Sequence, residues 1–222
     1  MGRGAPNNAL HPTLLRCSFD FASLRSGCSF ANRLTQVVGC FEHIMGLKIS
    51  TIAAKIGRAT FQETSFSVWN KLEPVEKHTF ATFDELSRWT EAELRYTENL
   101  LAFYQDGDWA ILSDTGQYRL ADEKELCLLS EKVGQVIVAL AHTTSSMYWF
   151  KVYENGGLRR KLCSDDGRIE RYGEPLANED ILDSSRFWLT DVEHLLKSFG
   201  LRPYVADCEG EGPFAAVEVT EP

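Results

Sequence analysis

The chain has 222 residues, of which 44% are hydrophobic and 25% are charged, and its formal net charge is −9. This composition is sufficient for one buried core and is ordinary for a globular protein. No apolar run is long enough for a transmembrane helix, and no apolar segment follows the N-terminal arginines as it would in a signal peptide. The sequence therefore predicts a soluble cytoplasmic protein without a membrane segment.

The negative charge is unevenly distributed along the chain. Residues 1–44 contain four arginines, one aspartate and one glutamate, a net charge of +2, so the remaining residues carry −11. A body this acidic repels phosphate backbones, which argues against nucleic-acid binding. The same charge favours a basic protein as the partner.

Residues 1–44 also differ from the rest in lacking a helical or strand period, and Met45 would suit a translation start. Three explanations stay open: an upstream extension of a protein that begins at Met45, a transit peptide, or an N-terminal arm. We expect this extension to lie outside the fold. We expect residues 45–206 to form a single domain, and the Gly- and Glu-rich residues 207–222 to form a flexible acidic tail.

Three pairs of residues have the spacing of a helix capping box, in which the first side chain accepts a hydrogen bond from the backbone of the second. These pairs are Thr82 with Glu85, Asp122 with Glu125, and Thr190 with Glu193. Apolar residues at helical spacing follow them, and Gly134 and Gly200 stand at C-cap positions. Helices are therefore predicted at 82–93, 122–133 and 190–199.

The other apolar segments are short and rich in β-branched and aromatic residues, which indicates strands. Asp106-Gly107 is a hairpin-turn signal, and the later connections, such as Asp165-Asp166-Gly167, are too short to join any but adjacent antiparallel strands. The predicted fold class is α+β: a mostly antiparallel meander sheet packed by about three helices, in a single domain. Strands are predicted at 47–55, 66–69, 100–104, 109–112, 136–141, 147–153, 158–162 and 168–172.

Motifs for metal, cofactor or catalytic chemistry are missing from the sequence. The five histidines and six cysteines form no C-x-x-C or H-E-x-x-H pattern, and no glycine-rich phosphate loop precedes a helix. Asp165-Asp166-Gly167 has the composition of a turn and lacks the twelfth-position glutamate of a calcium loop. We therefore predict no metal, no cofactor and no catalytic residue.

One constellation allows an alternative in the enzyme class. His142 lies beside hydroxyl residues at a predicted strand end, and Cys163 lies near carboxylates. A small hydrolase-like enzyme with a site assembled around these two residues is the alternative to a binding protein. A housekeeping scaffold domain without a small ligand is a third possibility.

The acidic residues nearest the last predicted strand are the candidates for partner binding. They are Asp165, Asp166, Glu170 and Glu174. The basic run at residues 159–161 falls in the preceding strand, where Arg159 and Lys161 should share one face and Arg160 the other.

The segment Tyr148–Arg160, with its Glu-Asn-Gly-Gly turn, and the segment Tyr172–Glu179, with Gly-Glu-Pro-Leu, resemble small uncharacterised bacterial proteins of the polymorphic-toxin immunity type. The resemblance covers about residues 100–200 and implies no catalytic residues. It implies an immunity-type inhibitor of a basic toxin or effector. Together with the charge, it makes a non-enzymatic acidic protein-binding domain the leading hypothesis.

Overall fold

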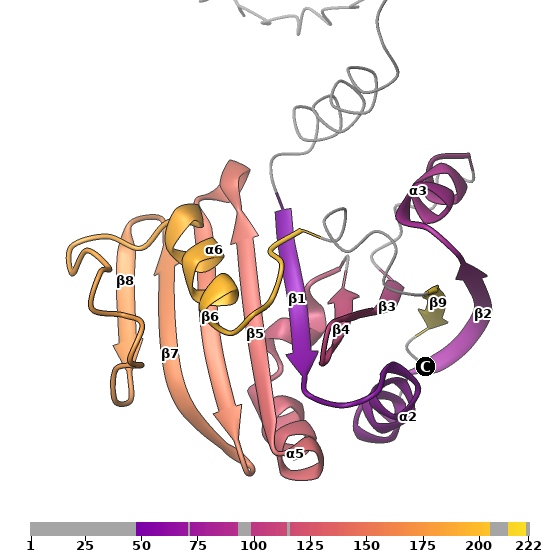
Figure 1. The fold of residues 1–222 in the computed structure, drawn as a ribbon, viewed down its shortest axis with the longest axis horizontal. Coiled ribbons are helices and arrows are strands. Elements are labelled where there is room, and N and C mark those ends of the chain that lie inside the picture. The colour runs from indigo at the N-terminus through magenta and orange to yellow at the C-terminus, as the bar shows by residue number, and fades with distance from the viewer. Residues whose placement is uncertain (1–47, 71, 93–98, 115, 205–212, 221–222) are drawn as a thin grey trace, which may run out of the picture. The chain divides into compact units, whose positions relative to one another are not determined.

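Nine antiparallel strands form one sheet in the computed structural model, which describes residues 48–220 except 71, 93–98, 115 and 205–212 (Figure 1). The strand order is β2-β9-β3-β4-β1-β5-β6-β7-β8, so the last four strands form the predicted meander. The strands are β1 (Lys48–Ala54), β2 (Glu73–Phe80), β3 (Leu100–Asp106), β4 (Trp109–Asp114), β5 (Gln135–His142), β6 (Met147–Glu154), β7 (Gly157–Asp165), β8 (Arg168–Tyr172) and β9 (Phe214–Thr220).

The three helices predicted from capping signals are confirmed as α3, α5 and α6. The side chains of Thr82 and Asp122 accept hydrogen bonds from the backbone of Glu85 and Glu125, at 3.2 Å each. Two further helices, α2 and α4, were not predicted. The helices are α2 (Arg58–Val68), α3 (Phe83–Ala92), α4 (Tyr118–Ala121), α5 (Glu123–Val133) and α6 (Leu189–Ser198), with a 3-10 turn, η2, at Thr143–Ser145.

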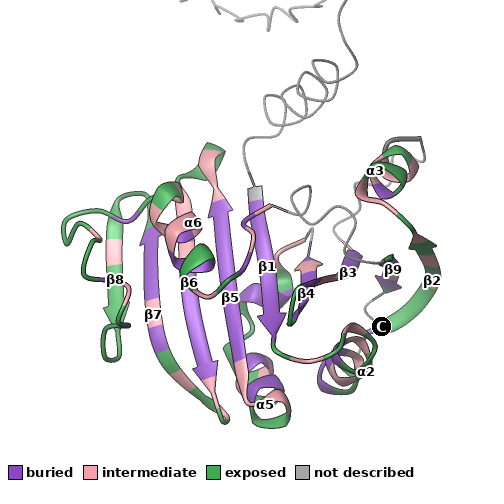
Figure 2. Cartoon of the chain, in the orientation of Figure 1, coloured by how far each residue is buried: buried purple, intermediate pink, exposed green. Residues whose placement is uncertain are grey.

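The sheet is buried on both faces at its centre (Figure 2). Along β5, Ile137 and Ala139 face the core that contains Leu86 of α3 and Leu195 of α6, which we call the α6 face. Val136, Val138 and Leu140 face the opposite core, which contains residues of α2, α4 and α5 and is called the α5 face. Burial on both faces explains why the central strands are almost continuously apolar.

Two segments do not have the secondary structure expected of them. Residues 66–69, expected as a strand, form the last turn of α2 and its C-cap. Residues 214–220, expected in the flexible tail, form β9 between β2 and β3. Their apolar side chains are buried in both cores, which an isolated tail could not achieve. Residues 1–44 and 207–212 lie outside the described residues.

The first hairpin turns one residue later than expected. Asp106 pairs with Trp109 in the ladder, so the turn consists of Gly107 and Asp108. The Asp106 carboxylate is buried and accepts hydrogen bonds from the backbone and the side chain of Arg202, at 2.7 and 2.6 Å. This contact ties the segment after α6 to the β3–β4 hairpin.

None of the helices in the described ranges has the length and apolar character needed to cross a membrane.

Candidate binding surface

Residues 173–188 connect β8 to α6 without a helix or strand, and we call them the strap. Leu176 and Phe187, near its two ends, are buried in the core of the α6 face. An irregular segment of this length needs polar contacts to fix it, because its backbone makes few hydrogen bonds of its own.

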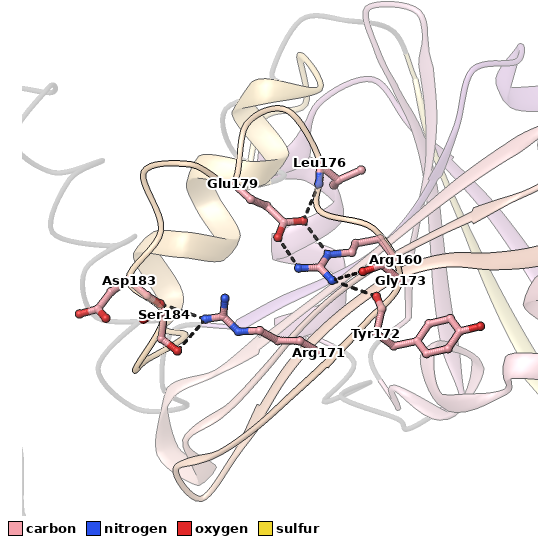
Figure 3. A network of polar contacts seen from close by, with 8 residues as sticks. All are labelled: Arg160, Arg171, Tyr172, Gly173, Leu176, Glu179, Asp183 and Ser184. Atoms are coloured by element: carbon pink, nitrogen blue, oxygen red, sulfur yellow. Dashed lines mark hydrogen bonds and ion pairs between the residues drawn. The ribbon is translucent and has the colours of Figure 1, made fainter.

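A buried ion pair holds the first half of the strap on the sheet (Figure 3). Arg160 of β7 and Glu179 of the strap are 4% and 9% exposed, and the Arg160 Nε lies 2.7 Å from the Glu179 Oε1. Arg160 Nη1 also donates to the carbonyl oxygens of Tyr172 and Gly173, at 3.1 and 2.7 Å. Glu179 accepts from the backbone N–H of Leu176 at 3.0 Å. Both charges are therefore satisfied inside the protein, as burial requires.

A β-bulge aims Arg160 at the strap. The ladder between β6 and β7 shifts between Val152, which pairs with Arg160, and Tyr153, which pairs with Leu158. Arg159 is the extra residue, so Arg160 points to the α6 face while Leu158 packs on the α5 face. The expected alternation of the basic run thus holds for residues 160 and 161, but the bulge interrupts it at Arg159.

The second half of the strap is fixed from β8. Arg171 Nη2 donates to the carbonyl oxygens of Asp183 and Ser184, at 2.9 and 3.2 Å (Figure 3). The Asp183 carboxylate accepts from the hydroxyl and backbone N–H of Ser185, and it pairs with Arg186 at 3.2 Å. The bonds from Ser185 are the main reason why the pKa of Asp183 is lowered, so this carboxylate keeps its charge in mildly acidic solution.

The fixed strap presents two large apolar side chains to solvent. Ile181 is 68% exposed and Trp188 is 51% exposed. The Trp188 ring lies 6.1 Å from that of Tyr148, and an open depression of about 350 Å³ adjoins it. The depression is lined by Arg186, Trp188, Leu189 and Thr190. Trp69 and Trp109 are buried and Trp89 and Trp149 are half-buried, so Trp188 is the tryptophan best placed for contact with a partner.

Acidic residues are frequent in the segments that flank this exposed apolar surface along the chain. Residues 165–193 run from the β7–β8 turn through β8 and the strap into α6, and we call them the acidic margin. They contain nine acidic and three basic residues, a net charge of −6, to which the buried Glu179 contributes one charge that Arg160, outside the segment, neutralises. The margin therefore accounts for two thirds of the net charge of −9.

All four predicted partner-binding residues lie exposed on the acidic margin, although they are spread along it. Asp165 and Asp166 stand at the β7–β8 turn, Glu170 in β8, and Glu174 at the start of the strap. Glu170 is paired with Lys161 at 2.8 Å, a bond that is the main reason for the raised pKa of the lysine. For the other three carboxylates, no ion pair is found with any described residue.

His142 and Cys163 lie two strands apart in the sheet. His142 ends β5 and its Nδ1 lies 2.7 Å from the Ser145 hydroxyl oxygen, whereas Cys163 lies two strands away on β7. Strands are about 4.8 Å apart, so the two backbones are separated by roughly 10 Å or more. Burial raises the pKa of Cys163 to about 11, which keeps the thiol protonated and poorly nucleophilic near neutral pH.

The buried thiol makes stability sensitive to alkaline pH. An unfolded thiol ionises near pH 9.0, whereas Cys163 ionises at about 11 in the fold. Its contribution is complete below pH 9 and is lost as the pH rises to about 11, an expected decrease in unfolding free energy of about 2–3 kcal/mol. Urea titrations across this range should show a smaller decrease for Cys163→Ala. Equal decreases for both proteins would contradict the assignment to Cys163.

The sequence did not reveal the Arg160–Glu179 pair or the exposure of Trp188. In the sequence, Arg160 looks like an ordinary surface residue of a strand. Trp188 stands between a phenylalanine and a leucine, so it looks like an ordinary core residue. Within the described ranges, no group of three or more histidine, cysteine or acidic side chains is arranged to bind a metal ion.

The fold and this surface define an α+β protein with an open antiparallel sheet and an acidic, partly apolar margin at one end. Comparisons of the chain with protein-family models, with curated proteins and with solved structures find no match.

Proposed function

We propose that the chain is a non-enzymatic protein-binding domain that uses the acidic margin to bind a basic protein. The specific form that we propose is an immunity-type inhibitor of a basic toxin or effector. The observation that carries the proposal is the combination of exposed Trp188 and Ile181 with an excess of exposed carboxylates on a segment fixed by a buried ion pair.

Each part of this surface has a physical role in binding. The buried Arg160–Glu179 pair orders the strap before a partner arrives, which reduces the conformational entropy lost on association. Trp188 supplies a large aromatic anchor, the kind of side chain that dominates binding energy at interfaces. The surrounding carboxylates attract a basic partner over several ångströms and accelerate its encounter.

The first test uses the full chain as bait in a lysate of the native host, at low and physiological salt. We expect one basic protein to bind stoichiometrically and to bind more weakly as salt rises, because salt screens exposed charges. The triple variant Asp165→Asn/Asp166→Asn/Glu174→Gln should weaken binding about tenfold or more, mainly through slower association.

A matched control removes the same charge elsewhere. Glu63, Glu73 and Glu131 are exposed and lie on α2, β2 and α5, outside the acidic margin. Their combined change to glutamine should alter binding less than the margin variant does. Equal effects of the two triples would show that net charge alone matters, and a partner retained without loss at high salt would contradict the electrostatic part of the proposal.

A further inference from the structure

The two outer edges of the sheet differ in how they are protected against pairing with another strand. The β2 edge carries Pro74, a register shift between Pro74 and Glu76, and the exposed Lys77. Proline, irregular pairing and lysine are the usual means by which proteins block an edge. The β8 edge has no proline and a regular register with β7, and four of its five residues are exposed; its protection is limited to the charged side chains of Arg168, Glu170 and Arg171.

The turn before β8 determines which backbone groups face outward. Asp166 and Gly167 have φ values of +46° and +79°, so they form a two-residue turn with both residues in the left-handed region. The residues that flank such a turn, Asp165 and Arg168, exchange both backbone hydrogen bonds, and this pattern alternates along the ladder. Ile169 and Arg171 therefore direct their N–H and C=O groups away from β7.

The outward groups of β8 are open to a further strand. Among the described residues, no backbone hydrogen bond from the strap or another segment reaches Ile169 or Arg171. The strap is held instead by the Arg171 side chain, which leaves the backbone of this residue unused. Figure 2 shows β8 as mostly exposed at the end of the sheet.

The charge at the ends of β8 indicates what would pair there. Asp165 and Asp166 precede the strand and Glu174 follows it, and none of these three carboxylates has a cationic partner among the described residues. A strand laid along β8 would pass close to these carboxylates, so basic side chains would be favoured at its ends. Arg168 and Arg171 of β8 itself disfavour basic side chains directly opposite them.

We propose that β8 binds an extended, basic segment of the partner protein by adding it to the sheet as a tenth strand. This inference rests on the proposed function and specifies its mode: main-chain hydrogen bonds from Ile169 and Arg171 supply affinity, and the flanking carboxylates select basic sequences. The nearby strap offers Trp188 and Ile181 to residues that flank the added strand.

A second copy of the chain is a poorer occupant. In a symmetric antiparallel pairing of two β8 strands centred on Glu170, that residue would face its own copy and Asp166 would face Glu174. Like charges directly opposite one another destabilise a strand pair. The same carboxylates that favour a basic segment therefore oppose pairing between two copies.

The test uses a short alternating Lys–Val peptide with the full chain, at low salt. With saturating peptide, NMR amide exchange of Ile169 and Arg171 should slow about tenfold or more, because each amide gains a hydrogen bond. The same peptide methylated on every backbone nitrogen has no N–H donor on either edge, so it cannot complete the ladder and should bind about tenfold more weakly. A Glu–Val peptide should not bind measurably.

A proline scan of the two edges completes the experiment. Ile169→Pro removes an outward N–H without breaking a hydrogen bond to β7. It should weaken binding of the Lys–Val peptide about tenfold. Val75→Pro, at the irregular position of the β2 edge, is the matched control and should leave peptide binding unchanged. Thermal unfolding of both variants checks that the fold is retained.

Three outcomes would overturn the inference. If the methylated peptide binds as well as the unmethylated one, and Ile169 stays in fast exchange, charge alone attracts basic segments and the proposed function stands without strand addition. If neither peptide binds, strand addition fails, and the lysate experiment with the margin variant tests the function separately. If sedimentation shows a dimer of the free chain that Ile169→Pro dissociates, the occupant is a second copy.

Discussion

Replacing Glu179 by alanine is expected to lower the free energy of unfolding by about 3–5 kcal/mol, the loss typical of a buried ion pair from which one partner is removed. Arg160 is only 4% exposed and, as an arginine, stays charged at any ordinary pH. The carbonyl oxygens of Tyr172 and Gly173 would still accept from it but cannot neutralise its charge. Urea denaturation of both proteins, with the slope compared as well as the midpoint, measures the change.

Two further variants identify the cause of that loss. Arg160→Met combined with Glu179→Leu removes both charges and should destabilise less than Glu179→Ala alone, since no unpaired charge is left inside. Arg88→Ala breaks an exposed pair with Asp84 in α3, for which about 0.5 kcal/mol or less is expected. A loss at Glu179 as small as that at Arg88 would mean that water reaches Arg160.

The same pair connects stability with the proposed binding. Without Glu179 the strap keeps its contacts through Arg171, Leu176 and Phe187 but loses the one that fixes its first half. Ile181 would then be presented on a segment with more conformations, and part of the binding free energy would be used to order it. Hydrogen exchange should therefore rise in the strap before any global unfolding is seen.

Local signals in the sequence predicted the helices and the meander well. Thr82 and Asp122 each precede a helix, as predicted. Their side-chain oxygens accept a hydrogen bond from a backbone N–H in the first turn that has no partner within the helix. The third capping box is displaced: α6 begins at Leu189, and the Asp191 carboxylate accepts from the Trp188 backbone N–H in place of the expected Thr190 and Glu193. The type of element was predictable there, but its first residue was not.

The elements that were not predicted from the sequence are stabilised by tertiary contacts. The N-cap of α2, Gly57, has no capping side chain, and the helix contains Thr60, Thr64 and Phe66, which have higher strand than helix propensity. Its stability comes from burial of Phe61 and Val68 on the α5 face. Likewise β9 pairs with strands more than one hundred residues earlier in the chain, a contact that no local pattern encodes.

The candidate site was predictable in composition but not in geometry. Asp165, Asp166, Glu170 and Glu174 were singled out by charge, and all four are exposed on the acidic margin. Arg160 fixes the form of the margin. The direction of its side chain depends on a β-bulge, which the alternation of residues along the strand does not reveal.

Replacing Gly173 by alanine is expected to destabilise the fold by about 3 kcal/mol or more, because two separate penalties meet at this residue. Its φ of +81° lies in the left-handed region, which costs a residue with a Cβ about 1 kcal/mol. A Cβ there would also lie 1.9 Å from the carbonyl oxygen of Arg159 and 3.0 Å from its carbonyl carbon. Those are backbone atoms of β7, so the strap would have to move away from the sheet. Urea denaturation measures the loss.

Gly200 provides the matched control, since its φ is also +81° but nothing lies within 4 Å of a Cβ built on it. Gly200→Ala should therefore cost only the backbone penalty of about 1 kcal/mol, and the difference between the two variants isolates the close approach at Gly173. Equal losses would mean that the strap shifts freely and that the Gly-Glu-Pro segment is only a turn. A larger loss at Gly173 would mean that this glycine lets the strap backbone lie against β7, where Arg160 can bind the carbonyl of Gly173 and the carboxylate of Glu179 at once.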